Sequence, residues 1–350
     1  MRFYSYGVML LVGGACGAFA HGASADPSTL PAVSNADAAA AQSTPTAIPP
    51  VVVSATAVPL TPNEQLQGEG TAAAGYKVDT VQNVGPLGSL PIQDTPYSVS
   101  VMPLDMINNV QALTPDQLFK MNPATQVYLT NSRGGETEVN IRGFADPAVM
   151  EDGLRSSVFR MDLEDKERVE VLEGLTGFLY GPDNPGGAIN YVLKRPTPYR
   201  FNRVTIGDAG GGSGYIHGDF GGPLDAAGRF GYRLNIVAQG GDGAIDDSRL
   251  RRALISGAFD AHLTPDLLLQ LDASYSSYHE NGIPPTWIFI PGAPHPNAPD
   301  NSKDWGQSYT QGDDSMAKGG ATLTYHINDA LTWRSAVKLI DEHQRNYVLA

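Results

Sequence analysis

The sequence lacks the features of a helical membrane protein and of a nucleic-acid-binding protein. Its only cysteine is Cys16, so the chain from residue 26 onward has no thiol and no disulfide. No continuous apolar stretch reaches the length of about 20 residues that a transmembrane helix needs. The 23 basic and 37 acidic residues give a formal net charge of -14, which argues against nucleic acid as a partner. With 17% charged residues and 39 glycines, the composition is typical of a turn-rich β protein.

Residues 1–25 have the pattern of a secretory signal peptide. Arg2 supplies a basic start, an apolar run follows over residues 8–19, and A-S-A at 23–25 offers a small-residue cleavage site. The apolar run is too short for a membrane anchor. Residues 26–75, rich in Ala, Pro, Ser and Thr, bury too little apolar surface to offset chain entropy, so we expect a disordered linker.

One segment of this linker differs in composition from the rest. A run of β-branched residues in a disordered region is a ready-made strand that has no partner within its own segment. We therefore expect it to pair with the sheet edge of another protein, the alternative being an accidental valine cluster. The segment comprises Val51, Val52, Val53, Ser54, Ala55 and Thr56.

Short apolar words alternate with turns rich in Gly, Pro, Asn and Asp between residues 139 and 197. This texture predicts a meander of small β elements rather than a helical domain. Their order, wording and spacing resemble the plug domain of TonB-dependent outer-membrane receptors, especially the ferric-siderophore receptors. The words are V-N-I-R-G-F (139–144), M-E-D-G-L-R (150–155), E-R-V-E-V-L-E-G (167–174) and L-Y-G-P-D-N-P-G-G-A-I-N-Y-V-L-K-R-P-T (179–197).

The resemblance implies a plug domain over residues 76–196, with opening strands at 75–80 and 92–101. It also implies that residues 51–56 are the TonB box, which pairs with TonB by β-augmentation. Within the plug, Thr114-Pro115-Asp116 predicts a helix start that continues to about Met121. Asn122-Pro123 then stops the helix.

Several charged and small residues of the plug are expected to have structural roles. Arg142, followed by Gly143, is expected to be a buried guanidinium that ties loops or barrel carboxylates together. By the resemblance, Arg168 and Glu170 lock the plug to the barrel wall. Three glycines are expected to occupy turns with positive φ rather than to form a phosphate cradle: Gly181, Gly186 and Gly187.

Ligand contacts are expected at the plug apices. The resemblance places these apices at Tyr128–Glu138, Ala145–Ala148 and Arg155–Arg160. Arginine and aromatic side chains suit an anionic ferric chelate edged with aromatic rings. The candidate ligand-binding residues are Arg133, Phe159 and Arg160, and the alternative is that they are merely solvated loop residues.

After residue 196 the texture changes to long alternating strands, one face apolar and the other mostly polar, as a lipid-facing barrel requires. Short turns alternate with a long Pro- and Asn-rich connection at 281–315. We therefore predict a mainly β protein, with an α+β plug inside a transmembrane antiparallel β-barrel over residues 197–350. Plugged transporters have 22 strands; we expect a truncated receptor, because only about seven are predicted here: 201–209, 213–223, 229–241, 250–263, 266–280, 316–327 and 330–345.

The function that the resemblance implies is uptake of a ferric siderophore across the outer membrane of a Gram-negative bacterium. Energy would be relayed by TonB, working with ExbB and ExbD. Iron would arrive within its chelator, and we expect neither a cofactor nor a protein-built metal site, because the histidines form no ligand-spaced pair. Alternatives are a receptor for haem, cobalamin or a sugar, a passive porin-like channel, and a non-functional fragment. An enzyme is not expected, since no nucleophile and base can be assigned.

Overall fold

The computed structural model describes most of the chain in two parts. One is a long curved sheet, which we call the barrel sheet, and the other is a compact domain between residues 69 and 196, which we call the plug. The described residues are 2–9, 69–81, 89–130, 137–145, 147–156, 160–176, 184–283, 292, 294, 297–300, 302–307, 309–329 and 331–347.

The barrel sheet is antiparallel throughout, in the order β1-β17-β16-β15-β14-β13-β12-β11. Seven of its strands confirm the prediction made from alternation, and the largest change is that β16 begins five residues before the predicted position. Their bounds are β11 Phe201–Asp208, β12 Gly214–Pro223, β13 Phe230–Asp242, β14 Arg249–Thr264, β15 Leu267–Asn281, β16 Gln311–Asn328 and β17 Leu331–Tyr347.

The eighth strand, β1 (Arg2–Met9), pairs with β17 so that Arg2 lies opposite His343. It falls within the predicted signal peptide. Cleavage at residues 23–25 would remove β1 from the sheet. The signal peptide stays a prediction.

Connections at the two ends of the barrel sheet differ in length. At one end the connections are 224–229, 265–266 and 329–330, and at the other end they are 209–213, 243–248 and 282–310, so that the longest connection and the two shortest ones lie at opposite ends. Short turns are typical of the periplasmic end of an outer-membrane barrel and long loops of the outer end. We name the two ends the short-turn end and the long-loop end.

The plug is built on a mixed five-stranded sheet, in the order β4-β9-β10-β7-β8, in which β10 and β7 are parallel. Two small antiparallel pairs, β2-β3 and β5-β6, flank it. The strands are β2 Thr80–Val81, β3 Leu90–Pro91, β4 Ser98–Pro103, β5 Thr125–Thr130, β6 Thr137–Ile141, β7 Ala148–Glu151, β8 Leu154–Arg155, β9 Lys166–Glu173 and β10 Gly187–Leu193. The helices are α2 Leu104–Asn109 and α3 Pro115–Phe119, with single 3-10 turns at Ala72–Ala74 and Ile92–Asp94.

The two helices cover the plug sheet and complete an apolar core. Ile107 of α2 and Phe119 of α3 pack with Val169, Val171 and other buried side chains of the sheet. The helix α3 begins at the predicted Pro115. The Oε1 atom of Gln117 accepts hydrogen bonds from the backbone N–H groups of Leu113 and Thr114. The plug therefore has a hydrophobic core of its own.

The prediction of an opening strand at 75–80 was wrong for most of its length. Only Thr80 belongs to a strand, because Gly75 and Tyr76 have left-handed φ angles of 66° and 60° that end the preceding 3-10 turn. The resemblance that implied this strand did not take the turn into account. Of the second opening strand, predicted at 92–101, only residues 98–101 lie in a strand, as part of β4, and Ile92–Asp94 form a 3-10 turn instead.

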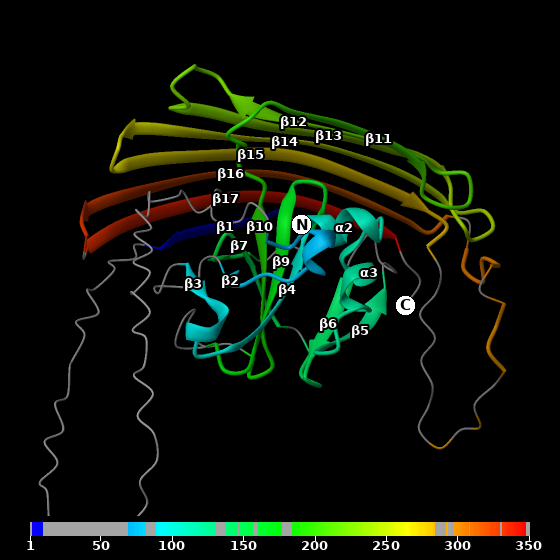
Figure 1. The fold of residues 1–350 in the computed structure, drawn as a ribbon. Coiled ribbons are helices and arrows are strands. Elements are labelled where there is room, and N and C mark those ends of the chain that lie inside the picture. The colour runs from blue at the N-terminus through cyan, green and yellow to red at the C-terminus, as the bar shows by residue number, and fades with distance from the viewer. Residues whose placement is uncertain are drawn as a thin grey trace, which may run out of the picture.

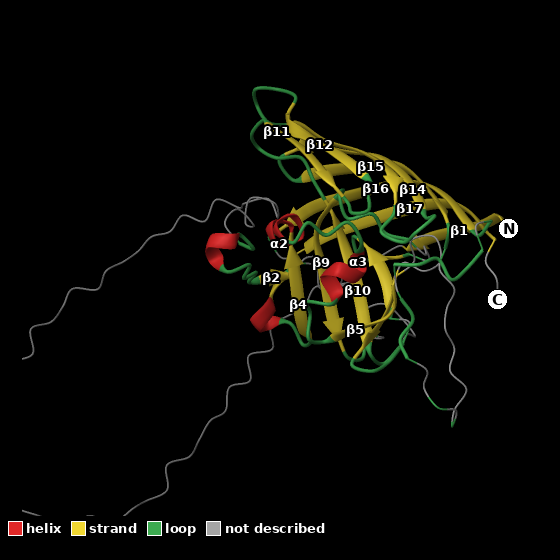
Figure 2. Ribbon diagram, turned by 90° about the vertical axis from the view of Figure 1, so that its right-hand side faces the viewer, coloured by secondary structure: helices red, strands yellow, loops and turns green. Residues whose placement is uncertain are grey.

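The barrel sheet arches over the plug, which lies against the concave face (Figure 1). A view turned by 90° shows the plug strands crossing the barrel strands at a steep angle (Figure 2). Within the described ranges, no helix is long and apolar enough to cross a membrane. The elements that carry the site are therefore the plug strands and the inner face of the barrel sheet.

Candidate functional site: the charged interface between plug and barrel sheet

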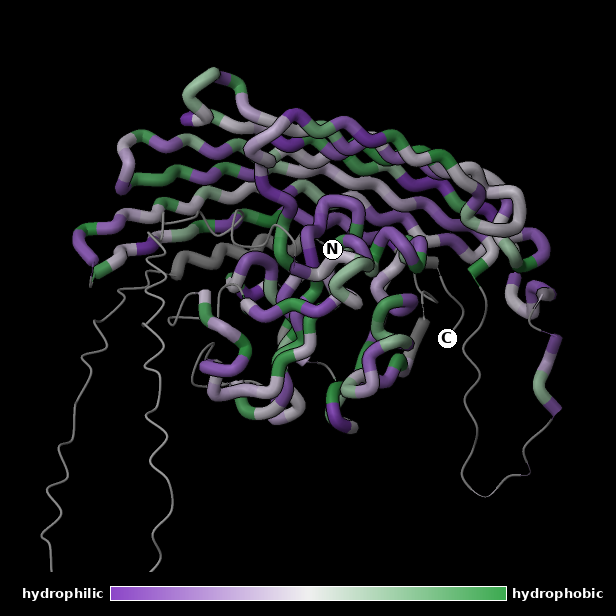
Figure 3. The backbone as a smooth tube through the Cα atoms, in the orientation of Figure 1, coloured by the Kyte–Doolittle hydropathy of each residue, from purple (hydrophilic) through white to green (hydrophobic). Residues whose placement is uncertain are grey.

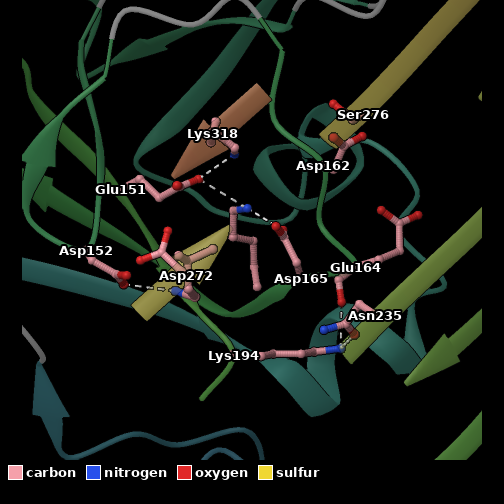
Figure 4. Close-up of polar contacts among 12 residues, drawn as sticks. Glu151, Asp152, Asp162, Glu164, Asp165, Lys194, Asn235, Asp272, Ser276 and Lys318 are labelled. Carbon is pink, nitrogen blue, oxygen red and sulfur yellow. Dashed lines mark hydrogen bonds and ion pairs between the residues drawn. The ribbon is translucent and has the colours of Figure 1, made fainter. Parts of the chain in front are cut away.

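The plug meets the barrel sheet through buried charged groups rather than through apolar side chains (Figure 4). Side chains alternate along each barrel strand, so one set points to the plug and the next set points away. The inward set is rich in charged side chains. Its partners in the plug lie at the end of β7, in residues 160–166 and in the residues directly after β10. We call this contact the ionic interface.

Glu151, the last residue of β7, is the centre of the largest cluster. One carboxylate oxygen is 2.8 Å from the Nζ atom of Lys318 and 3.3 Å from that of Lys166, and the other bonds to Lys338. Lys318 and Lys338 come from the barrel strands β16 and β17. Glu151 is 1% exposed, so a plug carboxylate is enclosed by three ammonium groups in a water-poor setting.

Arg160 and Asp162 form a second cluster. The guanidinium of Arg160 is 2.8 Å from Asp162, 3.2 Å from the Asp314 carboxylate on β16 and 2.9 Å from the Ser276 hydroxyl on β15. It also lies 5.1 Å from the centroid of the Tyr278 ring, at cation–π distance. Three of these four contacts, those with Asp314, Ser276 and Tyr278, tie a loop of the plug to two neighbouring barrel strands.

Arg252 on β14 bridges two acids of the same plug loop. Its guanidinium is 3.4 Å from Asp162 and 3.1 Å from Glu164, and it bonds a second time to the other Glu164 oxygen. The side chain of Gln239 on β13 accepts a further hydrogen bond of 3.2 Å from Arg252. Such a fork of parallel bonds fixes the orientation of the loop as well as its position.

Lys194 and Arg195 fasten the end of the plug to the short-turn half of the sheet. The Nζ atom of Lys194 donates to the backbone oxygen of Glu164 at 2.7 Å and to Asp219 on β12 at 2.8 Å. Asp219 in turn receives two bonds from Arg233 on β13, of 2.6 and 2.8 Å. Arg195 pairs with Asp260 on β14.

The pKa values of the plug groups show that this arrangement favours charge. Burial by itself would raise the pKa of Glu151, but Lys318, Lys338 and Lys166 hold it well below its usual range. For Asp162 the penalty of burial is again exceeded, here by Arg160 and Arg252, and its pKa falls to about 2. Burial lowers the pKa of Lys194, although Asp219 acts in the opposite direction. The two acids are thus ionised throughout the physiological range.

Several residues of the predicted sites lie outside the described residues. They are the TonB-box residues 51–56, the ligand candidates Arg133 and Phe159, and Gly181. The third ligand candidate, Arg160, is 3% exposed and binds protein groups on several sides. This placement makes it a structural contact of the ionic interface. Its contact with a ligand stays a prediction.

The expectations for Arg142, Arg168 and Glu170 need correction. Arg142 is exposed and has a left-handed φ of 53°, because it begins the turn with Gly143 directly after β6 instead of lying inside a strand. Arg168 and Glu170 form a buried ion pair at 3.0 Å, but Arg168 donates to the backbone oxygen of Thr80, and Glu170 accepts from Asn190. These partners belong to the plug, so the pair joins plug strands rather than plug and wall.

Of the glycines predicted to have a positive φ, Gly186 and Gly187 are described, and the prediction holds for one of them. Gly187 has a φ of 139°, and a Cβ there would lie 2.0 Å from the backbone oxygen of Leu172, so the close pairing of β10 with β9 requires glycine. Gly186 does not have a positive φ. It is required by space instead, because a Cβ would lie 2.6 Å from the backbone oxygen of Ile141.

Sequence reasoning missed most of the ionic interface. Glu151 belongs to the segment M-E-D-G-L-R (150–155), but the neighbouring residues in this segment do not indicate that it pairs with lysines of the barrel. A usable signal lies in the barrel strands, where Arg252, Lys318 and Lys338 occupy inward positions of otherwise alternating segments. Charge at such positions indicates an occupied barrel interior.

The comparisons with known proteins agree with this architecture. Residues 91–188 match the family model described as TonB-dependent Receptor Plug Domain. The metal-pseudopaline receptor CntO of Pseudomonas aeruginosa is 28% identical over 267 residues, covering 73% of this chain and 36% of the relative. The ferrichrome outer membrane transporter/phage receptor of Escherichia coli is 29% identical, over 54% of this chain and 25% of the relative.

Solved structures show the same fold. The ferric preacinetobactin receptor BauA of Acinetobacter baumannii superposes with a TM-score of 0.72 at 22% identity, covering 77% of this chain and 41% of that one. The pyoverdine receptor FpvA of Pseudomonas aeruginosa gives 0.67 at 21% identity, over 77% of this chain and 40% of that one. The chain thus spans about a third of the length of the first curated relatives that it matches.

Plug, barrel sheet and relatives together define the class of fold: the chain has the fold of TonB-dependent receptors, with a plug docked on a barrel sheet. The relatives above are named as receptors and transporters, not as enzymes. Over the described residues, no group of three or more His, Cys, Asp or Glu side chains is placed to hold a metal ion. The ionic interface fastens the plug to the inner face of the barrel sheet.

Proposed function

We propose that this protein takes up a ferric siderophore across the outer membrane of a Gram-negative bacterium, with energy relayed by TonB. One observation carries the proposal: a plug with its own apolar core is fastened to the inner face of a barrel sheet by buried ion pairs. Relatives named for ferric pyoverdine and ferrichrome support the cargo class.

The chemistry of the ionic interface suits a domain that must move and return. An apolar contact would expose hydrocarbon to water when the plug shifts, whereas separated carboxylates, ammonium and guanidinium groups regain water on both sides. A buried pair adds little net stability over its hydrated parts, but it specifies one position strongly. Pulling on residues 51–56 would break the interface, and the same partners would restore it on release.

TonB would engage residues 51–56 by adding this segment as a strand to an exposed sheet edge. ExbB and ExbD are the expected partners of TonB in the inner membrane. The chelate would bind at the long-loop end, and the arginine and aromatic candidates Arg133 and Phe159 have the side-chain chemistry that suits it. Iron would stay within its chelator as cargo, and no cofactor of the protein itself would take part.

A second cargo class is favoured by a specific comparison. The first relative is named a metal-pseudopaline receptor, so another metal carried by a small organic chelator is the alternative to a ferric siderophore. A passive porin-like channel is disfavoured, because a docked plug has no place in it.

The test is uptake of radioactive iron, supplied with a panel of siderophores, by cells that make the protein in their outer membrane. Deleting residues 51–56 should abolish uptake while binding of the chelate to the cell surface remains. A deletion of equal length at residues 34–39, also in the linker, is the matched control and should leave uptake unchanged. Uptake that survives the first deletion, or that is lost equally in both, would contradict the role of TonB.

A further inference from the structure

One histidine of the barrel sheet is buried in the ionic interface but takes part in none of the ion pairs described above. Hydrophilic and hydrophobic residues alternate along the barrel strands (Figure 3). His217 on β12 lies two residues before Asp219, which binds the plug, so the two side chains share the inner face, and His217 is 8% exposed. The intervening positions face outward, where exposed residues such as Ile236 and Ile255 form an apolar band. His217 is therefore a titratable group enclosed between barrel sheet and plug.

The side-chain amide of Asn235, on β13, connects the His217 ring to the plug, and Figure 4 shows Asn235 beside Lys194 and Glu164. In one orientation the amide nitrogen donates to the backbone oxygen of Glu164 at 3.0 Å, to the Asp219 carboxylate at 3.2 Å and to the Nε2 atom of His217 at 3.2 Å. In the opposite orientation the amide oxygen accepts from Lys194 at 3.3 Å, but it lies against the oxygens of Glu164 and Asp219. The first orientation therefore satisfies more groups.

The favoured orientation of the amide requires a ring nitrogen that accepts a hydrogen bond. A neutral imidazole has one accepting nitrogen, whereas a protonated ring donates from both nitrogens. The Nε2–H group of protonated His217 would meet an amide N–H group that also donates, so Asn235 would have to turn its oxygen toward the ring. That turn breaks the hydrogen bond from Asn235 to the plug backbone at Glu164 and places the amide oxygen against the carboxylate of Asp219.

The charges around the ring also oppose a second proton on His217. The surrounding titratable and charged groups come from the plug and from three barrel strands, and they are Lys194, Glu164, Tyr215, Asp219, Arg233 and Arg252. The three cations, one lysine and two arginines, outnumber the two carboxylates of the glutamate and the aspartate. A further positive charge on the buried ring would enlarge this excess.

We infer that His217 and Asn235 form an acid-sensitive latch between the barrel sheet and the plug. While the ring is neutral, the amide holds the plug backbone at Glu164; a second ring proton turns the amide and removes this attachment. When the plug is undocked, the ring meets water and titrates as an ordinary imidazole, with a pKa of about 6.5. Proton uptake thus accompanies undocking, so docking is strongest above this pH and weakens as the pH falls through it. The latch requires neither a cargo nor TonB, so it stands or falls separately from the proposed uptake.

Hydrogen exchange of the plug amides tests the latch in the full chain, folded in detergent micelles and compared at pH 7.5 and pH 5.5. After correction for the intrinsic pH dependence of exchange, exchange through undocking should be about tenfold faster at the lower pH, because the undocked ring binds a proton that the docked ring excludes. Asp162, with a pKa of about 2, stays ionised over this range. His217→Gln cannot be protonated, so its response to pH should disappear. An equal response in wild type and in His217→Gln would overturn the inference.

Two further variants separate the latch from a general effect of losing a histidine. His326→Gln removes an exposed histidine of β16 whose ring bonds to Thr332 within the barrel sheet, and it should keep the wild-type response. Asn235→Asp supplies oxygens alone, which accept from a protonated ring, so its docking should be weakest at neutral pH and should recover toward pH 5.5. A wild-type protein without a pH response, or Asn235→Asp with a response of the wild-type sign, contradicts the latch as well.

Discussion

The two faces of the barrel sheet have opposite chemistry although they are made of the same strands. On the inner face, charged and polar side chains such as Arg252, Asp314 and Lys318 are buried, each at most 7% exposed. On the outer face, Ile206 and Leu339 are exposed by 76% and 53%. A soluble protein shows the reverse distribution. The comparison teaches that alternation in this sheet places charge against the plug and apolar side chains on the exposed face.

The largest expected effect is on the inner face. Glu151→Gln would leave three buried ammonium groups without their shared anion, so the free energy that holds the plug in place should fall by about 3–5 kcal/mol. Hydrogen exchange of the plug amides in detergent-solubilised protein measures this quantity. Glu173→Gln, in the half-buried last position of β9, is the control and should change little. Equal losses in the two variants would show that Glu151 is no special contact.

The outer face should respond to charge according to depth. Ile255→Lys places an ammonium group in the apolar band and should reduce the free energy of folding into lipid vesicles by about 2–4 kcal/mol. Ala253→Lys, two residues closer to the long-loop end on the same strand and face, should cost about 0–1 kcal/mol. Folding titrations in vesicles compare the two. Equal costs would place the edge of the lipid band elsewhere.

Acid should weaken the inner face and spare the outer one. The pKa of Asp162 is about 2 in the docked plug against an ordinary value of 3.8. Because the docked pKa is the lower one, the stabilisation is complete above the ordinary value and is lost as the pH falls toward the docked value. The loss is on the order of 2 kcal/mol. Hydrogen exchange of the plug measured from neutral to acid pH tests this, and Asp162→Asn should flatten the profile. An unchanged profile in this variant would contradict the assignment.

The smallest effect is expected for an exposed ion pair in a turn, which belongs to neither face of the barrel sheet. Arg229 and Asp225 are 3.1 Å apart in a turn at the short-turn end, with the arginine side chain 64% exposed. Water and salt screen such a pair, so Arg229→Ala should leave stability unchanged within error. Thermal unfolding of the variant beside wild type is sufficient. A clear loss would mean that exposure is a poor guide to the value of an ion pair here.

The barrel strands were predictable because apolar and polar side chains alternate within each strand, so the sequence of one strand is enough to assign its two faces. Phe230, Tyr232 and Leu234 point one way and Arg233 and Asn235 the other, whatever the neighbouring strands do. Turn chemistry likewise indicated where strands end. The start of the plug was predicted less well, since its short strands are decided by pairing and by left-handed turns.

Ion pairs of the interface were beyond prediction for a different reason. Glu151 meets Lys318 and Lys338 across sequence separations of 167 and 187 residues. Nothing in the local sequence of Arg168 distinguishes a partner in the plug from one in the wall. Arg142 shows the same limit, since a strand-like word ended one residue earlier than expected and left its guanidinium exposed.

The sequence by itself determined the positions of the seven barrel strands, because periodicity and turn residues act over a few neighbouring positions, and the resemblance of the words at 139–197 to a plug domain indicated the class of protein. Only the tertiary structure decided which charges meet, which arginines face the plug and which face the membrane. Hydrogen bonds and close ion pairs form within a few ångströms. That proximity is created by strand register and by docking of the plug, and no local segment of the chain contains it.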